Sequence, residues 1–111
     1  MKAKQGKSGS IPLEDVVLEA FKDPKRAKFA VTLALEEFEK DNNVEILLDT
    51  LRLVAQAKGG IAKLARKADI SRKAIHEALS ADGNPRLRTF QSVLNGLGLR
   101  MSVKPAAPMA P

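Results

Sequence analysis

The chain has 111 residues, a length typical of one domain, and 44% of them are hydrophobic while only 4% are aromatic. With no Cys and a single His, disulfides, thiolate metal sites and multi-histidine sites are excluded, so we expect no metal and no cofactor. No apolar run approaches the roughly 20 residues that span a bilayer, and residues 1–10 lack the apolar core of a signal peptide; a soluble cytoplasmic protein is predicted.

The formal net charge of +6 is distributed unevenly along the chain. Residues 1–10 carry three Lys, residues 11–59 carry seven basic and ten acidic side chains, and residues 60–111 carry nine basic and three acidic ones. A basic half beside an acidic half favours a polyanion partner for the first and a different partner for the second. The alternative is a solvated surface whose asymmetry arose by chance.

The first half of the chain predicts a tail and three helices. Residues 1–10, rich in Lys, Gly and Ser, are expected to form a disordered basic tail. The apolar spacing over 13–21 predicts a first helix. Asp23 and Pro24 are typical of an N-cap followed by a first-turn proline, and they begin a helix that ends near residues 40–42. The inward residues expected there are Ala27, Ala30, Val31, Ala34, Leu35 and Phe38.

A third helix is predicted between an asparagine cap and a glycine pair. Asn42 or Asn43 can cap its start, and Gly59-Gly60 ends it because glycine accepts the left-handed conformation. Its expected inward residues are Ile46, Leu47, Leu51, Val54 and Ala55.

The second half predicts two short helices, a loop and a last helix. The short helices use Ile61, Leu64, Ala65 and Ala68, then Ile75, Ala78 and Leu79. The sequence SADGNP contains strong turn signals, and Asn84-Pro85 can cap the helix that follows. That helix is expected from about Arg86, with Leu87, Phe90, Val93, Leu94 and Leu97 buried.

Residues 99–103, LRMSV, alternate apolar and polar side chains and predict a short C-terminal β-strand. A lone strand needs a partner, most simply the same strand of a second copy, which would make the protein a homodimer. The alternative is a C-terminus that frays. With a flexible tail over 105–111, the chain would hold one helical domain over residues 11–104.

The join between the two short helices, at about 61–80, fits a helix-turn-helix. Helices of this length are unstable alone and must pack across a turn of three to four residues. Ser71 would cap the second helix, and Ile70 would place the turn in the core. Asp69 stands where such motifs have a left-handed glycine; aspartate tolerates that conformation better than most residues, so we expect a left-handed backbone there.

The outward face of the second short helix is the candidate DNA-reading surface, because in a helix-turn-helix this helix enters the major groove. Arg72 and Lys73 can bond guanine, and Glu77 can accept a bond from cytosine. His76 would contact a base or a phosphate, or is an ordinary exposed histidine. The basic helix start beyond the loop is typical of phosphate binding. The candidate DNA-binding residues are Lys63, Lys67, Ser71, Arg72, Lys73, His76, Glu77, Asn84, Arg86, Arg88 and Thr89.

Several segments in one order, including FKDP at 21–24, GGIAKLA at 59–65 and LSADGNPRL at 79–87, resemble the HigA-type addiction-module antidotes, a branch of the lambda-repressor-like (Xre-type) antitoxins. The resemblance covers about residues 13–103. It implies an all-α, lambda-repressor-like helical bundle that binds the promoter of its own operon. It also implies a partner, a small basic RelE/ParE-like toxin.

The acidic segment offers the predicted toxin contacts Glu36, Glu37 and Glu39, which are otherwise an exposed helix face. Two alternatives to the antitoxin hypothesis stay open: a stand-alone helix-turn-helix regulator without a toxin, and a helical adaptor that binds only protein. An enzyme is disfavoured by the lack of cysteine, of a glycine-rich phosphate loop and of carboxylates placed around a nucleophile.

Overall fold

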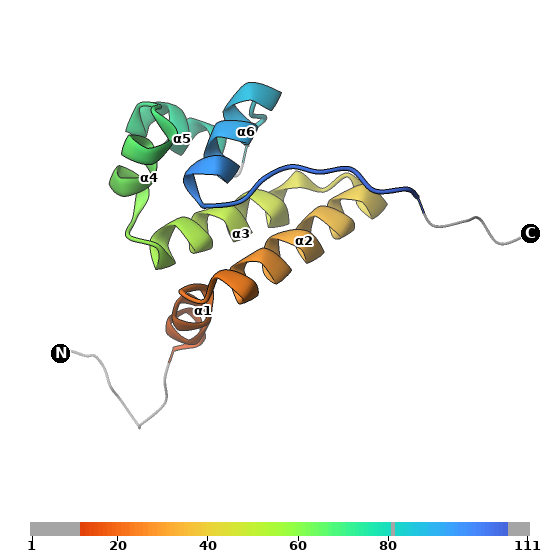
Figure 1. The fold of residues 1–111 in the computed structure, drawn as a ribbon, viewed down its shortest axis with the longest axis horizontal. Helices are drawn as coiled ribbons and strands as arrows, with labels where there is room; N and C mark the ends of the chain where they lie inside the picture. The colour runs from red at the N-terminus through yellow and green to blue at the C-terminus, as the bar shows by residue number, and fades with distance from the viewer. Residues whose placement is uncertain (1–11, 81, 107–111) are drawn as a thin grey trace, which may run out of the picture.

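The computed structural model describes residues 12–80 and 82–106, so the expected tail over 1–10 and most of the tail over 105–111 lie outside the described residues. The described ranges hold six α-helices and no strand (Figure 1). The helices are α1 (Leu13–Phe21), α2 (Pro24–Asp41), α3 (Val44–Ala57), α4 (Ile61–Ala68), α5 (Arg72–Ala78) and α6 (Leu87–Gly96). The expectation of an all-α chain is confirmed.

Helix α3 lies at the centre of the molecule. Helices α1 and α2 pack against one side of it, and α4 to α6 lie on the other side, where α4 contacts α3 and α6 (Figure 1). The largest fully buried side chains come from α3, from α5 and its C-cap, and from α6, and all are aliphatic, in keeping with the low aromatic content; they are Leu48, Leu51, Val54, Ile75, Leu79 and Val93. One core therefore joins the two sides.

The helix boundaries follow from local capping chemistry. Asp23 accepts a 3.0 Å hydrogen bond from the Lys25 N–H, and Pro24 occupies the first turn of α2, as predicted. Asn42 ends α2 with φ 59°, and Asn43 begins α3 by accepting a bond from the Glu45 N–H at 2.9 Å. The two asparagines thus share the turn between α2 and α3.

Some expected burial is wrong. Ile46 and Leu87 are 53% and 72% exposed, whereas Leu48, which the sequence analysis did not single out, is fully buried. The buried row of α3 passes through Leu47, Leu48 and Leu51, one position round the helix from Ile46. Leu87 is the first residue of α6 and precedes the turns whose side chains reach the core.

The predicted strand at residues 99–103 is also wrong for this chain. The Leu99 N–H bonds to the Leu94 carbonyl at 2.8 Å and Leu99 packs against the core. Beyond it the chain runs along α3 toward the end of α2 (Figure 1), where Lys104 lies 3.7 Å from Glu36. Its neighbours are helices, whose backbone groups already bond within each helix, so no ladder forms.

A buried leucine and an exposed leucine together test this description of the core. We expect Leu51→Ala to lower the free energy of unfolding by about 2–5 kcal/mol, because the substitution leaves a cavity at a fully buried position. The control Leu87→Ala, at an exposed position, should change it by less than about 0.5 kcal/mol. Urea unfolding followed by far-ultraviolet circular dichroism measures both, and equal losses would contradict this description of the core.

Candidate nucleic-acid interface

The turn between α4 and α5 is built as the sequence predicts. Asp69 has φ 57° and ψ 47°, so the expected left-handed backbone is confirmed, and the Ile70 N–H bonds back to the Ala65 carbonyl at 3.1 Å. Ser71 Oγ accepts a bond from the Ala74 N–H at 3.0 Å, which fixes the start of α5. Ile70 packs against the core, so the turn is held from the inside.

Helix α5 presents one apolar and one polar face. Ile75, Ala78 and Leu79 are buried at its inner side and C-terminal end. The four side chains of α5 that are candidates for contacting DNA bases are all exposed; they are Arg72, Lys73, His76 and Glu77. The structure therefore brings these four side chains together on the surface. Ser71 is exposed as well, but its hydroxyl is engaged in the cap.

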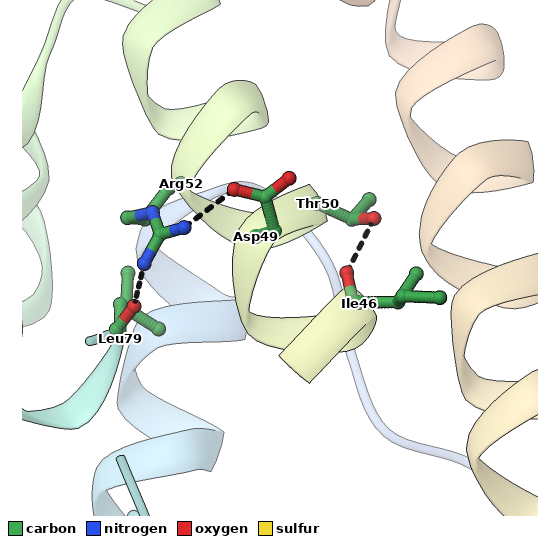
Figure 2. Close-up of polar contacts among 5 residues, drawn as sticks. All are labelled: Ile46, Asp49, Thr50, Arg52 and Leu79. Atoms are coloured by element: carbon green, nitrogen blue, oxygen red, sulfur yellow. Dashed lines mark hydrogen bonds and ion pairs between the residues drawn. The ribbon is translucent and has the colours of Figure 1, made fainter. Parts of the chain in front are cut away.

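A single arginine ties α5 to the central helix. Arg52 of α3 donates one hydrogen bond to the Leu79 carbonyl at the end of α5 and another to the Asp49 carboxylate (Figure 2). A cation at a helix C-terminus satisfies a carbonyl that has no partner in the helix and interacts favourably with the helix dipole. Sequence reasoning missed Arg52 because its carbonyl partner is 27 residues away.

The loop after α5 leads to the second group of candidates. Asn84, Arg86 and Arg88 are exposed, and Thr89 is half-buried. Arg86 is the N-cap of α6 and makes no side-chain cap bond, so the alternative role of Asn84 as a cap is not observed. Gly83 is needed in this loop, since a Cβ there would lie 2.3 Å from the Ala78 carbonyl oxygen. The close approach sets where the basic start of α6 lies relative to α5.

The candidates on α4 lie beside a hollow. Lys63 and Lys67 are exposed, and with Lys58 they line a pocket of about 130 Å³ between the end of α3, α4 and the end of α6. Sequence reasoning missed Lys58. In the sequence it stands out only as the residue before Gly59 and Gly60, which predict the end of the helix. The pocket brings together one lysine from the end of α3 and two from α4.

The ion pairs are distributed unevenly between the two halves of the molecule. Within the described ranges four ion pairs lie inside the segment from α1 to α3, and the fifth joins Lys104 to Glu36. None of these pairs involves the exposed cations from α4 to the start of α6, which are Lys63, Arg66, Lys67, Arg72, Lys73, Arg86 and Arg88. Among the described residues, these seven cations therefore take part in no ion pair.

The predicted toxin contacts are spread around α2. Glu36 is half-buried beside Lys104, Glu37 pairs with Lys40 at 3.2 Å, and Glu39 is exposed. At 3.6 residues per turn these three carboxylates do not share one face. Sequence reasoning missed Phe29 and Leu33, which are 64% and 44% exposed and lie one turn apart on the outer side of α2.

No metal-ligand cluster and no helix able to cross a membrane occurs among the residues that the structure describes. The fold and this surface define a small all-helical protein with a basic half and an acidic half.

A family model described as "probable addiction module antidote protein" matches residues 23–105. The chain is 35% identical over 74 residues to an uncharacterised protein of Haemophilus influenzae, which covers 67% of this chain and 75% of the relative. The chain belongs to this antidote family, and no solved structure matches it significantly.

Removing the guanidinium of Arg52 tests the contact that holds α5. We expect Arg52→Ala to lower the free energy of unfolding by about 1–2 kcal/mol, because the side chain is only 36% exposed and its carbonyl partner loses its donor. The matched control is Arg26→Ala, whose ion pair with Asp23 is 70% exposed on the arginine side, and it should cost less than about 0.5 kcal/mol. Urea titrations of both variants make the comparison, and an Arg52 loss no larger than the control would contradict the role.

Proposed function

We propose that the chain is the DNA-binding antitoxin of a type II toxin-antitoxin module, acting in the cytoplasm. In this proposal α4 and α5 form a helix-turn-helix of the lambda-repressor type that binds the promoter of its own operon, and another surface neutralises a small basic RelE/ParE-like toxin. The observation that carries the DNA proposal is the group of exposed, unpaired cations surrounding α5.

The outward face of α5 suits the major groove, which admits an α-helix. Arg72 at the start of α5 can make two bonds to guanine, and Lys73 can reach guanine or phosphate. His76 lies one turn after Arg72, and Glu77 one turn after Lys73, so the four side chains cover neighbouring positions on one surface. Arg52 and the Ser71 cap hold this helix in place before DNA arrives, which lowers the cost of ordering on binding.

The remaining cations serve as backbone clamps in this proposal. Arg86, Arg88 and Asn84 lie around the N-terminus of α6, whose first N–H groups have no side-chain cap. Lys63 and Lys67 extend the positive surface along α4, and Lys58 adjoins them. Contacts to phosphate set affinity and register, while contacts from α5 to bases set sequence choice.

The proposed toxin surface is the outer side of α2. Phe29 and Leu33 supply exposed apolar area. Glu36 and Glu37 follow Leu33 by about one turn and supply negative charge that complements a basic partner, and Glu39 lies to one side of them. A stand-alone regulator without a toxin is the second candidate function. The family description, which names an antidote, favours the antitoxin. A homodimer would place two α5 helices about 34 Å apart, one turn of DNA.

Band-shift titration on the promoter upstream of the gene tests the DNA proposal. Arg72→Ala and Lys73→Ala should each weaken binding by about five- to 150-fold, the effect of losing a good base contact. Arg26→Ala is the control, because Arg26 lies on α2 and pairs with Asp23. Affinity should also fall steeply with salt as phosphate contacts release counterions. Full binding by both α5 variants, or a flat salt response, would show that α5 does not read DNA.

Co-expression with the product of a small basic reading frame beside the gene tests the toxin proposal. The double variant Phe29→Ala/Leu33→Ala should weaken the complex by about 30-fold or more if the aromatic side chain is an anchor of the interface. Leu13→Ala removes an apolar side chain that is 77% exposed on α1 and serves as the control. Affinity measured by calorimetry separates the two. If no complex with the neighbour ever forms, the stand-alone regulator is the better description.

A further inference from the structure

We propose that the pocket between the end of α3, α4 and the end of α6 is a binding site for one phosphate group, held by Lys58, Lys63 and Lys67. The phosphate group can belong to a free ion, to a phosphorylated small molecule or to a nucleic-acid backbone, which share this chemistry. With a DNA backbone as the source, the inference rests on the proposed function and gives the clamps on α4 a defined site. With a free phosphate it requires neither DNA nor a toxin.

The charge around this lysine pocket is entirely positive. The pocket has a volume of about 130 Å³, and its lining holds three lysines and no acidic residue. Among the described residues, none of the three lysines takes part in an ion pair. Lys58 is half-buried, whereas Lys63 and Lys67 are exposed. Like charges gathered around one hollow repel one another, and an anion bound between them replaces that repulsion by attraction.

Close packing of the helices builds the pocket and directs one of its lysines. A Cβ at Gly59 would lie 2.6 Å from Cδ of Lys63, so the apolar stem of this lysine lies on the backbone that joins α3 to α4. A Cβ at Gly96 would lie 2.6 Å from Leu64 Cδ1, so α6 packs directly on α4. Lys67 follows Lys63 by four residues and lies on the same face of α4. The site is therefore largely preformed, which lowers the cost of binding.

A phosphate group matches the pocket in charge and in size. A phosphate ester carries about 1.5 to 2 negative charges at neutral pH and three strong acceptor oxygens, and each lysine ammonium offers three donors. A cavity of about 150 Å³ holds one benzene molecule, so the volume of about 130 Å³ accommodates a phosphate group but not an attached nucleoside. A carboxylate, with one charge and two oxygens, is a poorer match for three ammonium groups.

The lysine pocket is separate from the surface that α5 presents. Its lining comes from α3, α4, α6 and the residues that follow α3 and α6, where these segments come together (Figure 1), and it includes no residue of α5. Lys63 and Lys67 each stand two positions from the buried Ala65, about 160° around a helix of 3.6 residues per turn. A phosphate group in the pocket therefore leaves Arg72 and Lys73 accessible, and the two sites can be altered independently.

Titration of the full chain with inorganic phosphate, followed by NMR of the backbone amides, tests this site. Sodium chloride at the same ionic strength measures the effect of screening. We expect the signals of the lining glycines Gly60, Gly96 and Gly98 to shift saturably with phosphate and much less with chloride. The double variant Lys63→Gln/Lys67→Gln should raise the half-saturating concentration by about tenfold or more, because it removes two charge-assisted hydrogen bonds.

The matched control is Lys25→Gln/Lys28→Gln, which removes the same charge from exposed positions on α2. It should bind phosphate like the parent chain, and Lys63→Arg/Lys67→Arg, which keeps both charges, should retain most of the binding. All of these side chains are exposed, so the three variants should unfold in urea like the parent chain. Equal weakening by the control, shifts that grow without saturation, or equal shifts with chloride would overturn the site.

Promoter binding identifies the source of the phosphate group. If the source is the DNA backbone, Lys63→Gln/Lys67→Gln should weaken promoter binding about tenfold more than the α2 control does, and phosphate should compete with the promoter more strongly than chloride at equal ionic strength. If the source is a free phosphate or a phosphorylated small molecule, the two double variants should bind the promoter equally. Both results support the pocket and differ only in its occupant.

The outcomes also separate this inference from the proposed function. Saturable phosphate binding together with full promoter binding by Arg72→Ala and Lys73→Ala supports the pocket and removes the reading of DNA by α5. Promoter binding that depends on Arg72 and Lys73, without saturable phosphate binding, overturns the pocket and leaves the DNA proposal standing.

Discussion

Helices α4 and α5, with eight and seven residues, are too short to persist alone, and the rest of the structure is arranged around that constraint. Ile75 and Leu79 anchor α5 in the core that α3 and α6 complete. The left-handed residue at Asp69, the Ser71 cap and the guanidinium of Arg52 then fix the direction of α5 at its start and at its end. A short helix held at both ends can present polar side chains in a constant arrangement without contributing much to stability itself.

The charges of the two halves also differ, because among the described residues those of α1 to α3 are mostly paired and those of α4, α5 and the start of α6 are not. In the segment from α1 to α3 the ion pairs join residues three apart within the helices or across their ends, and all except Arg52–Asp49 are largely exposed. Such pairs contribute little to the free energy of unfolding. Their larger effect is to neutralise that half of the surface, so the unpaired cations on α4, α5 and the start of α6 dominate the field that an approaching polyanion meets.

Local signals in the sequence were sufficient for the helix boundaries and for the turn. The caps at Asp23 and Ser71, and the left-handed backbone at Asp69, depend on neighbours within a few residues, and each is found where the pattern places it. Burial was harder: Ile46 satisfies the helical spacing, yet the neighbouring row of α3 faces the core. The contact of Arg52 with Leu79 depends on the tertiary fold and cannot be read from local spacing. The alternation over 99–103 predicts a strand, yet the neighbours of this segment are helices and no ladder forms. The exposure of Arg72, Lys73 and His76 does follow from placing Ile75 inward, whereas the lambda-repressor likeness and the reading of DNA stay predictions.

The segment beyond Leu99 also has a consequence for hydrogen exchange. The backbone N–H groups of the described residues 100–104 make no backbone hydrogen bond, and these residues are exposed. Amides of this kind exchange with solvent at free energies near zero, whereas amides in the buried helices are protected up to the free energy of global unfolding. Hydrogen exchange therefore divides the described chain at Leu99 into a slowly exchanging helical part and a segment whose amides exchange while the rest stays folded.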